Sequence, residues 1–119
     1  RYIPVENSSR SNNKIKEITI NAPGQVMMSD ITYLKSKKRD YYLSLVVDAY
    51  SRKIFGFNLS DSLAALHAIR SLKQAIEQSG YKYSFHHSDG GVQYTCREYQ
   101  KYLSENGILS SMTRPASPQ

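Results

Sequence analysis

The sequence has no tryptophan and a single cysteine, Cys96. One cysteine cannot form an internal disulfide, which is typical of proteins that work in a reducing interior. No run of apolar residues approaches the length of a membrane span, and we find no signal peptide. These absences predict a cytoplasmic protein without a membrane partner.

Acidic residues are also scarce. The chain has 10 Asp and Glu against 16 Lys and Arg, a net charge of +6 and a sequence pI near 9.5. Such a balance favours a polyanionic partner, although many basic domains bind no nucleic acid. The length of 119 residues, with 39% hydrophobic residues, suits one domain with a modest core.

The chain is organised around residues 26–34, VMMSDITYL. Apolar residues occur at both odd and even positions of this stretch, which is typical of a central strand covered on both faces. Asp30 stands in its middle, and a buried carboxylate is costly unless something binds it. Asp30 is therefore either a catalytic or binding group, or an ordinary acid at a fraying end or beside an arginine.

The rest of the pattern predicts one domain over residues 25–119, preceded by a polar linker or upstream arm over residues 1–24. Three short strands with short links form an antiparallel meander, and helix and strand then alternate. The expected strands are 26–34, 41–49, 53–59, 81–88 and 108–113, and the expected helices are 62–79 and one opened by a capping box at Thr95–Glu98. This order predicts an α/β fold with a mixed five-stranded sheet and helices on its faces.

Helix ends carry their own signals. Ser60 or Asp61 is a candidate N-cap for the first helix, and Gly80 is a candidate C-cap.

A second acid, Asp89, follows a predicted strand and precedes Gly90 and Gly91. Strand ends present functional groups in α/β sheets, although Asp-Gly is also a common turn pair. The predicted topology brings this strand beside residues 26–34, so that Asp30 and Asp89 can meet. Two carboxylates that meet repel each other, and Mg²⁺ or Mn²⁺, which prefer oxygen ligands, would relieve that repulsion. Two acids alone hold two ions poorly, so a third acid is wanted.

Three segments stand in order at sensible spacing: Asp30-Ile31-Thr32-Tyr33, residues 47–52 (VDAYSR) and residues 87–94 (HSDGGVQY). Together they resemble the catalytic core of bacterial insertion-sequence transposases related to retroviral integrases, over roughly residues 25–119. The resemblance implies an RNase H-like fold, end-specific DNA cleavage and strand transfer with Mg²⁺, and catalytic acids of the Asp, Asp, Glu type. Asp30 and Asp89 match the first two acids.

The family's glutamate falls beyond Gln119, so the resemblance implies a core truncated before its third acid. Glu98 and Glu105 stand too early to match it. On the same grounds we expect Mg²⁺ or Mn²⁺ as cofactor, transposon ends and target DNA as partners, a homo-oligomer on DNA, and a bacterial, nucleoid-associated location.

Further residues are candidates for DNA contact. The basic loop at Lys35, Lys37, Lys38 and Arg39 is either a solvated turn or a phosphate-binding loop. Gln93 and Tyr94 either contact DNA or brace their own loop. Asp48 is expected to orient the turn at Ser51 and Arg52 through its side chain.

Two other functions fit the same residues. An RNase H-like nuclease would cleave strands without joining them. A non-catalytic DNA-binding or assembly module of the same fold would bind DNA without metal dependence.

Overall fold

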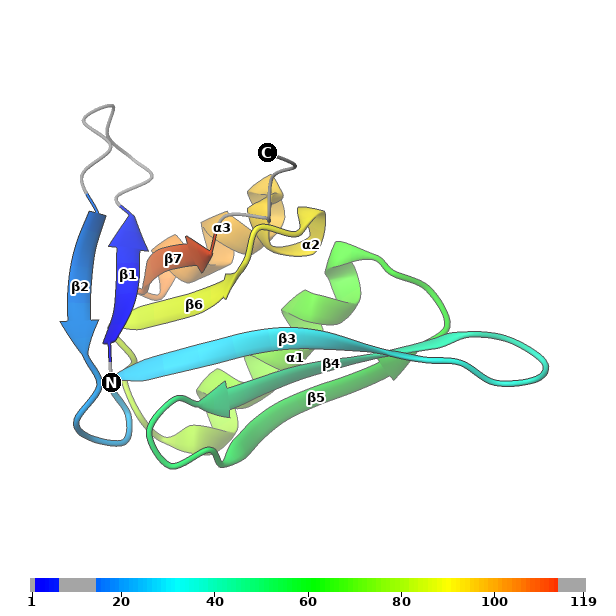
Figure 1. Cartoon of the computed structure of the whole chain (residues 1–119), viewed down its shortest axis with the longest axis horizontal. Coiled ribbons are helices and arrows are strands. Elements are labelled where there is room, and N and C mark those ends of the chain that lie inside the picture. Colours follow the sequence, from blue (N-terminus) through cyan, green and yellow to red (C-terminus); the bar gives the residue numbers. More distant parts are fainter. Residues whose placement is uncertain (1, 7–14, 114–119) are drawn as a thin grey trace.

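Two sheets form the scaffold of the molecule (Figure 1). The computed structural model describes residues 2–6 and 15–113. β1 (Tyr2–Glu6) and β2 (Ile15–Thr19) pair antiparallel as a two-stranded sheet. The main sheet has five strands in the order β5-β4-β3-β6-β7.

The main sheet is mixed, as predicted. β3 (Val26–Leu34), β4 (Tyr41–Asp48) and β5 (Ile54–Ser60) form the antiparallel meander. β6 (Phe85–Asp89) joins β3 in parallel, and β7 (Leu109–Thr113) joins β6 in parallel. β3 is therefore the central strand, with β6 directly beside it.

All three helices in the described residues pack on the same face of the main sheet. They are α1 (Ala65–Ser79), α2 (Val92–Thr95) and α3 (Arg97–Glu105). The core between helices and sheet consists of Met27, Val46, Ala68, Leu72, Ala75, Tyr83, Tyr94, Tyr99, Leu103 and Ile108. Because side chains alternate along a strand, the neighbours of Met27 and Val46 in sequence face the side that carries no helix here.

β5 and α1 approach each other closely at Gly56. A Cβ at this position would collide with the backbone carbonyl oxygen of Ser71 on α1. Glycine is therefore required here because a side chain would not fit. Backbone conformation is not the reason, because Gly56 is not among the glycines with positive φ.

The ends of several elements differ from the sequence prediction. α1 begins at Ala65, with Ala64 as an N-cap that has no side-chain hydrogen bond; neither Ser60 nor Asp61 caps it. The Ser60 hydroxyl instead donates to the carbonyl of Ser62, which keeps this segment in a local turn. The C-cap at Gly80 is confirmed, with a left-handed φ of 73°.

The predicted capping box at Thr95 is wrong. Thr95 ends the short helix α2, and Cys96, with an extended ψ of 155°, separates it from α3. Likewise β6 begins at Phe85 rather than at residue 81.

Within the described ranges, no helix is both long and apolar enough to span a membrane. The predicted arm over 1–24 contains β1 and β2, and β1 lies against β7. Residues 7–14 of that arm and residues 114–119 of the predicted core lie outside the described residues.

Candidate active site

The parallel ladder between β3 and β6 places the two predicted acids on one face. The ladder pairs Met28 with His87, and Asp30 and Asp89 each stand two residues further along their strands. Residues two apart on a strand point to the same side, and paired residues in neighbouring strands share a side. Asp30 and Asp89 therefore face the same side of the sheet, opposite the helices.

Both acids line one pocket of about 360 Å³, which we call the acid pocket. Its lining consists of Met28, Ser29, Asp30, Leu45, Val47, Arg52, His87, Ser88 and Asp89. The predicted convergence of the two strands is thus found. The lining thus includes two aspartates, one arginine and one histidine, which come from β3, β6 and the turn after β4.

Asp30 is exposed, not buried as the apolar pattern around it suggests. The first four residues of β3 are buried or half-buried, but from Asp30 onward the strand is mostly exposed. The pairing with β6 ends at Met28, so the strand runs past its neighbour. The Asp30 carboxylate accepts a hydrogen bond from the backbone N–H of Ile31 at 2.9 Å and stays accessible.

Asp89 forms the turn that its sequence context also allowed. Its carboxylate accepts a hydrogen bond from the Gly91 N–H at 2.8 Å. A Cβ on Gly91 would lie 2.9 Å from the Asp89 carboxylate and 2.7 Å from the Gln93 amide oxygen. Gly91 thus leaves room for a carboxylate that is oriented by its turn and still lines the acid pocket.

Behind the acids, on the helix side, three polar groups bond to one another. The Ser29 hydroxyl lies 2.7 Å from His86 Nε2 and 3.1 Å from the Tyr99 hydroxyl, and the Tyr99 hydroxyl lies 2.8 Å from His86 Nε2. His86 is fully buried, and burial lowers its pKa to about 3, with a further contribution from His87. A neutral imidazole therefore links β3, β6 and α3. Ser29 itself lines the acid pocket, and His86 directly precedes His87, which lines it too.

Tyr94 belongs to the core beneath the acids. It is 2% exposed, and its hydroxyl has no hydrogen-bond partner among the described residues. Burial raises the pKa of Tyr94, and nearby Tyr99 and the charges of Asp89 and Asp30 raise it further. This placement favours bracing over DNA contact for Tyr94, while Gln93 is half-buried on the short helix α2.

Asp48 fixes the turn between β4 and β5, as expected. Its buried carboxylate accepts hydrogen bonds from the N–H groups of Gly24, Tyr50 and Ser51 and from the Tyr83 hydroxyl, at 2.6–2.9 Å. Burial alone would raise the pKa of Asp48, but these four donors outweigh it and hold the pKa below its usual value. Asp48 is thereby a structural anion.

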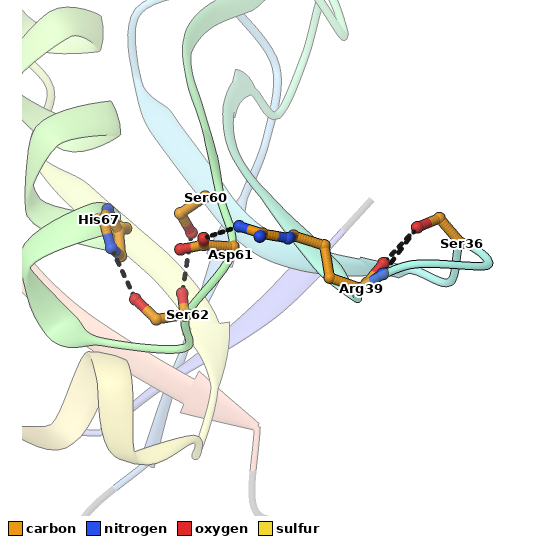
Figure 2. A network of polar contacts seen from close by, with 6 residues as sticks. All are labelled: Ser36, Arg39, Ser60, Asp61, Ser62 and His67. Atoms are coloured by element: carbon orange, nitrogen blue, oxygen red, sulfur yellow. Dashed lines mark hydrogen bonds and ion pairs between the residues drawn. The ribbon is translucent and has the colours of Figure 1, made fainter.

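The basic loop between β3 and β4 is exposed throughout. Figure 2 shows the polar contacts that Ser36 and Arg39 of this loop make. Arg39 forms an ion pair with Asp61 at 2.9 Å, and its backbone carbonyl accepts from the Ser36 hydroxyl. Lys35, Lys37 and Lys38 do not line the acid pocket, and the loop projects from the end of the sheet (Figure 1). A contact between this loop and DNA stays a prediction.

No third acid joins the pair in the part of the chain that the structure describes. There, no group of three His, Cys, Asp or Glu side chains is placed to hold a metal ion. Glu98 and Glu105 are exposed residues of α3, on the helix side of the sheet. The donor set of the acid pocket fits one hard divalent cation through carboxylate oxygens and is short of ligands for two.

Sequence reasoning did not find two features of this site. The sequence predicts Arg52 only as a turn residue, and the alternation along β4 gives no sign that the following turn lines the pocket. The Ser29–His86–Tyr99 network depends on contacts far apart in sequence. Its one available signal is strand parity, which places His86 on the opposite face of the strand from Asp89.

A mixed sheet in this order, with a carboxylate from each of two adjacent central strands, defines the RNase H-like class of folds. Residues 20–118 match the family model described as "Integrase core domain". The chain belongs to this integrase core family.

Known proteins resemble this chain in both sequence and fold. An insertion-sequence transposase of Lactococcus lactis is 35% identical over 101 residues, covering 82% of this chain and 39% of that protein. The HTLV-2 integrase catalytic core, solved with magnesium, shares the fold at a TM-score of 0.67 and 24% identity, covering 76% of this chain and 61% of that one. The intasome structure of simian T-cell lymphotropic virus contains a chain at 28% identity and a TM-score of 0.71, covering 81% of this chain and 34% of that one.

Proposed function

We propose that this chain is the catalytic core of a DNA transposase, which cleaves DNA strands and transfers them to new DNA in a metal-dependent reaction. The observation that carries the proposal is the acid pocket, to which β3 and β6 each contribute one aspartate. Membership of the integrase core family supports it. The chain spans only 39% of the Lactococcus relative, so the activity of the whole protein is itself part of this proposal.

Asp30 and Asp89 would hold a Mg²⁺ or Mn²⁺ ion. Such an ion, when bound, activates the attacking oxygen and stabilises the leaving oxygen of a phosphodiester. The protein's own part is to supply two carboxylates whose directions are fixed, Asp30 by the Ile31 N–H and Asp89 by the Gly91 N–H. Preorganised groups of this kind need no rearrangement as charge develops.

We infer that a third carboxylate comes from outside the described residues. Two aspartates with water can complete the octahedron of one ion, but a second ion then lacks a protein anchor. The 119-residue chain should therefore bind Mg²⁺ weakly and process DNA poorly. A longer chain that carries the third acid should bind the ion more tightly.

Transposition also implies partners. We propose transposon ends and target DNA as substrates, and a homo-oligomer that holds paired ends, with action on the chromosome in the bacterial cytoplasm. The net charge of +6 suits a polyanionic substrate. The HTLV-2 core is described in a dimeric form.

The test is a cleavage and strand-joining assay on labelled DNA with Mg²⁺ or Mn²⁺, using the longer chain and its variants. Asp30→Asn and Asp89→Asn should each lower the rate by about 100-fold or more, the scale of losing one preorganised charged group. Asp40→Asn is the matched control, because Asp40 is an exposed acid that does not line the acid pocket.

Three results would count against the proposal. Unchanged activity in both pocket variants would remove the mechanism. Cleavage without joining would favour an RNase H-like nuclease. Tight DNA binding that ignores metal, with no cleavage, would favour a binding module.

Metal binding can be measured without DNA. Mn²⁺ should raise the Tm of the wild type modestly, because ligand-linked stabilisation grows only with the logarithm of ion concentration over Kd. Asp89→Asn should abolish the increase. Because Asp30 is exposed, Asp30→Asn should leave the metal-free Tm nearly unchanged, and a large loss would make Asp30 a structural group instead.

A further inference from the structure

Arg52 reaches the acid pocket from a turn that is held rigidly. It stands in the turn after β4, and its N–H donates to the Asp48 carbonyl at 2.9 Å. The Asp48 carboxylate accepts hydrogen bonds from the N–H groups of Tyr50 and Ser51, the two residues just before Arg52. A buried anion thus fixes the backbone that presents the exposed Arg52 to the pocket.

The backbone of Arg52 is in a conformation that favours glycine. Its φ is 67°, and it is the one non-glycine residue with positive φ in the described ranges. A side chain in the left-handed region costs free energy that glycine would avoid. An arginine at such a position, lining a pocket that contains two acids, suggests that its guanidinium serves a function.

The guanidinium makes no ion pair with those acids in the described residues. In the described part of the chain, the ion pair is between Arg39 and Asp61, and Arg52 forms none although Asp30 and Asp89 line the same pocket. The positive charge of Arg52 is therefore available to a ligand.

We propose that Arg52 binds a backbone phosphate of the DNA strand that occupies the acid pocket, and so positions that strand against Asp30 and Asp89. This inference rests on the proposed function for its substrate class. A guanidinium presents several N–H donors in one plane and matches two phosphate oxygens at once. A phosphodiester strand carries one such group per nucleotide, so one phosphate can lie at the acids while a neighbouring one meets Arg52.

The experiment compares Arg52→Gly, Arg52→Ala and Arg52→Lys with wild type, and uses Arg70→Ala as the control. Arg70 is equally an exposed arginine, but it lies on α1, on the helix side of the sheet. Affinity for a short labelled DNA duplex is measured by fluorescence anisotropy over a series of salt concentrations with Mg²⁺, and Tm is measured without DNA.

Arg52→Gly should bind DNA about 10-fold or more weakly, with the slope of log affinity against log salt reduced by about 0.9, as for one lost phosphate contact. Its Tm should equal or exceed that of wild type, because glycine suits the positive φ. Arg52→Ala should weaken binding similarly, Arg52→Lys should retain part of it, and Arg70→Ala should match wild type.

A variant that is as stable as wild type yet binds DNA less well is the signature of a phosphate contact. Wild-type affinity and salt slope in Arg52→Gly, or no DNA binding by the wild type, would overturn the inference. If binding depends on Arg52 but no variant or wild type cleaves DNA, Arg52 keeps its assignment and the proposed catalytic function fails. If cleavage depends on both aspartates but DNA binding does not depend on Arg52, the proposed catalytic function stands and the inference about Arg52 fails.

Discussion

Two tyrosine hydroxyls in the core differ in their hydrogen bonding, and removing each hydroxyl oxygen tests the difference. The Tyr99 hydroxyl bonds to His86 and Ser29, whereas the Tyr94 hydroxyl, equally buried, has no partner among the described residues. Removing a hydrogen-bonded hydroxyl costs about 1 kcal/mol, but removing an unpaired buried one costs nothing or stabilises.

We therefore predict that Tyr99→Phe lowers the Tm by about 5 °C and that Tyr94→Phe does not lower it. Thermal melts of both variants beside wild type measure this. An equal loss in Tyr94→Phe would mean that its hydroxyl has a bonding partner, such as a buried water.

Residues of the site differ in how far the sequence could predict them. Asp30 and Asp89 were identifiable because their segments resemble a known family and because strand order brought them together. The exposure of Asp30 could not be predicted from the sequence. It depends on β3 running past β6, and the length of a strand relative to its neighbour leaves no local sequence pattern. Arg52 was missed for a related reason, because a turn residue's direction depends on the buried Asp48 beneath it.

At the scale of elements, the close contact of β5 with α1 sets a steric limit. We predict that Gly56→Ala destabilises the protein by about 3 kcal/mol or more, because a Cβ would overlap the Ser71 carbonyl and force the helix away from the sheet. Gly80→Ala is the matched control: nothing lies within 4 Å of its Cβ, so only the left-handed φ is penalised, by about 1 kcal/mol.

Denaturant unfolding of both variants gives the two free energies. A Gly56→Ala loss no larger than that of Gly80→Ala would show that α1 shifts easily on the sheet.

Element order was predictable, and element ends were less so. β3 was predicted with the bounds it has, because apolar residues stand at both of its ends and on both of its faces. The start of α1 was predicted too early, because Ser60 and Ser62 bond locally in place of capping the helix. Thr95 and Glu98 matched a capping box by spacing alone, and the extended backbone of Cys96 between two helices cannot be read from spacing.

At the scale of the whole molecule, the buried His86 makes stability depend on pH. Its pKa is about 3 in the folded protein and about 6.5 when unfolded, so below pH 6.5 the unfolded chain binds a proton that the folded chain does not. Stability is therefore full above pH 6.5 and falls as the pH drops toward the folded pKa. His87, whose pKa burial also lowers, adds in the same direction.

We predict that the free energy of unfolding falls by about 1 kcal/mol or more per pH unit between pH 6 and 4. Denaturant titrations across that range measure the slope, and NMR should show the His86 imidazole still neutral at pH 5. Protonation of His86 near pH 6 in the folded protein would contradict its burial.

The acid pocket also bears on the order in which the molecule folds. β3, β4 and β5 are consecutive and can pair through short loops, but β6 reaches β3 only after the chain has passed through the meander and α1. Such a long closure is slow compared with local pairing. The two aspartates therefore come together at a late step, and a nascent or partly folded chain has no formed acid pocket.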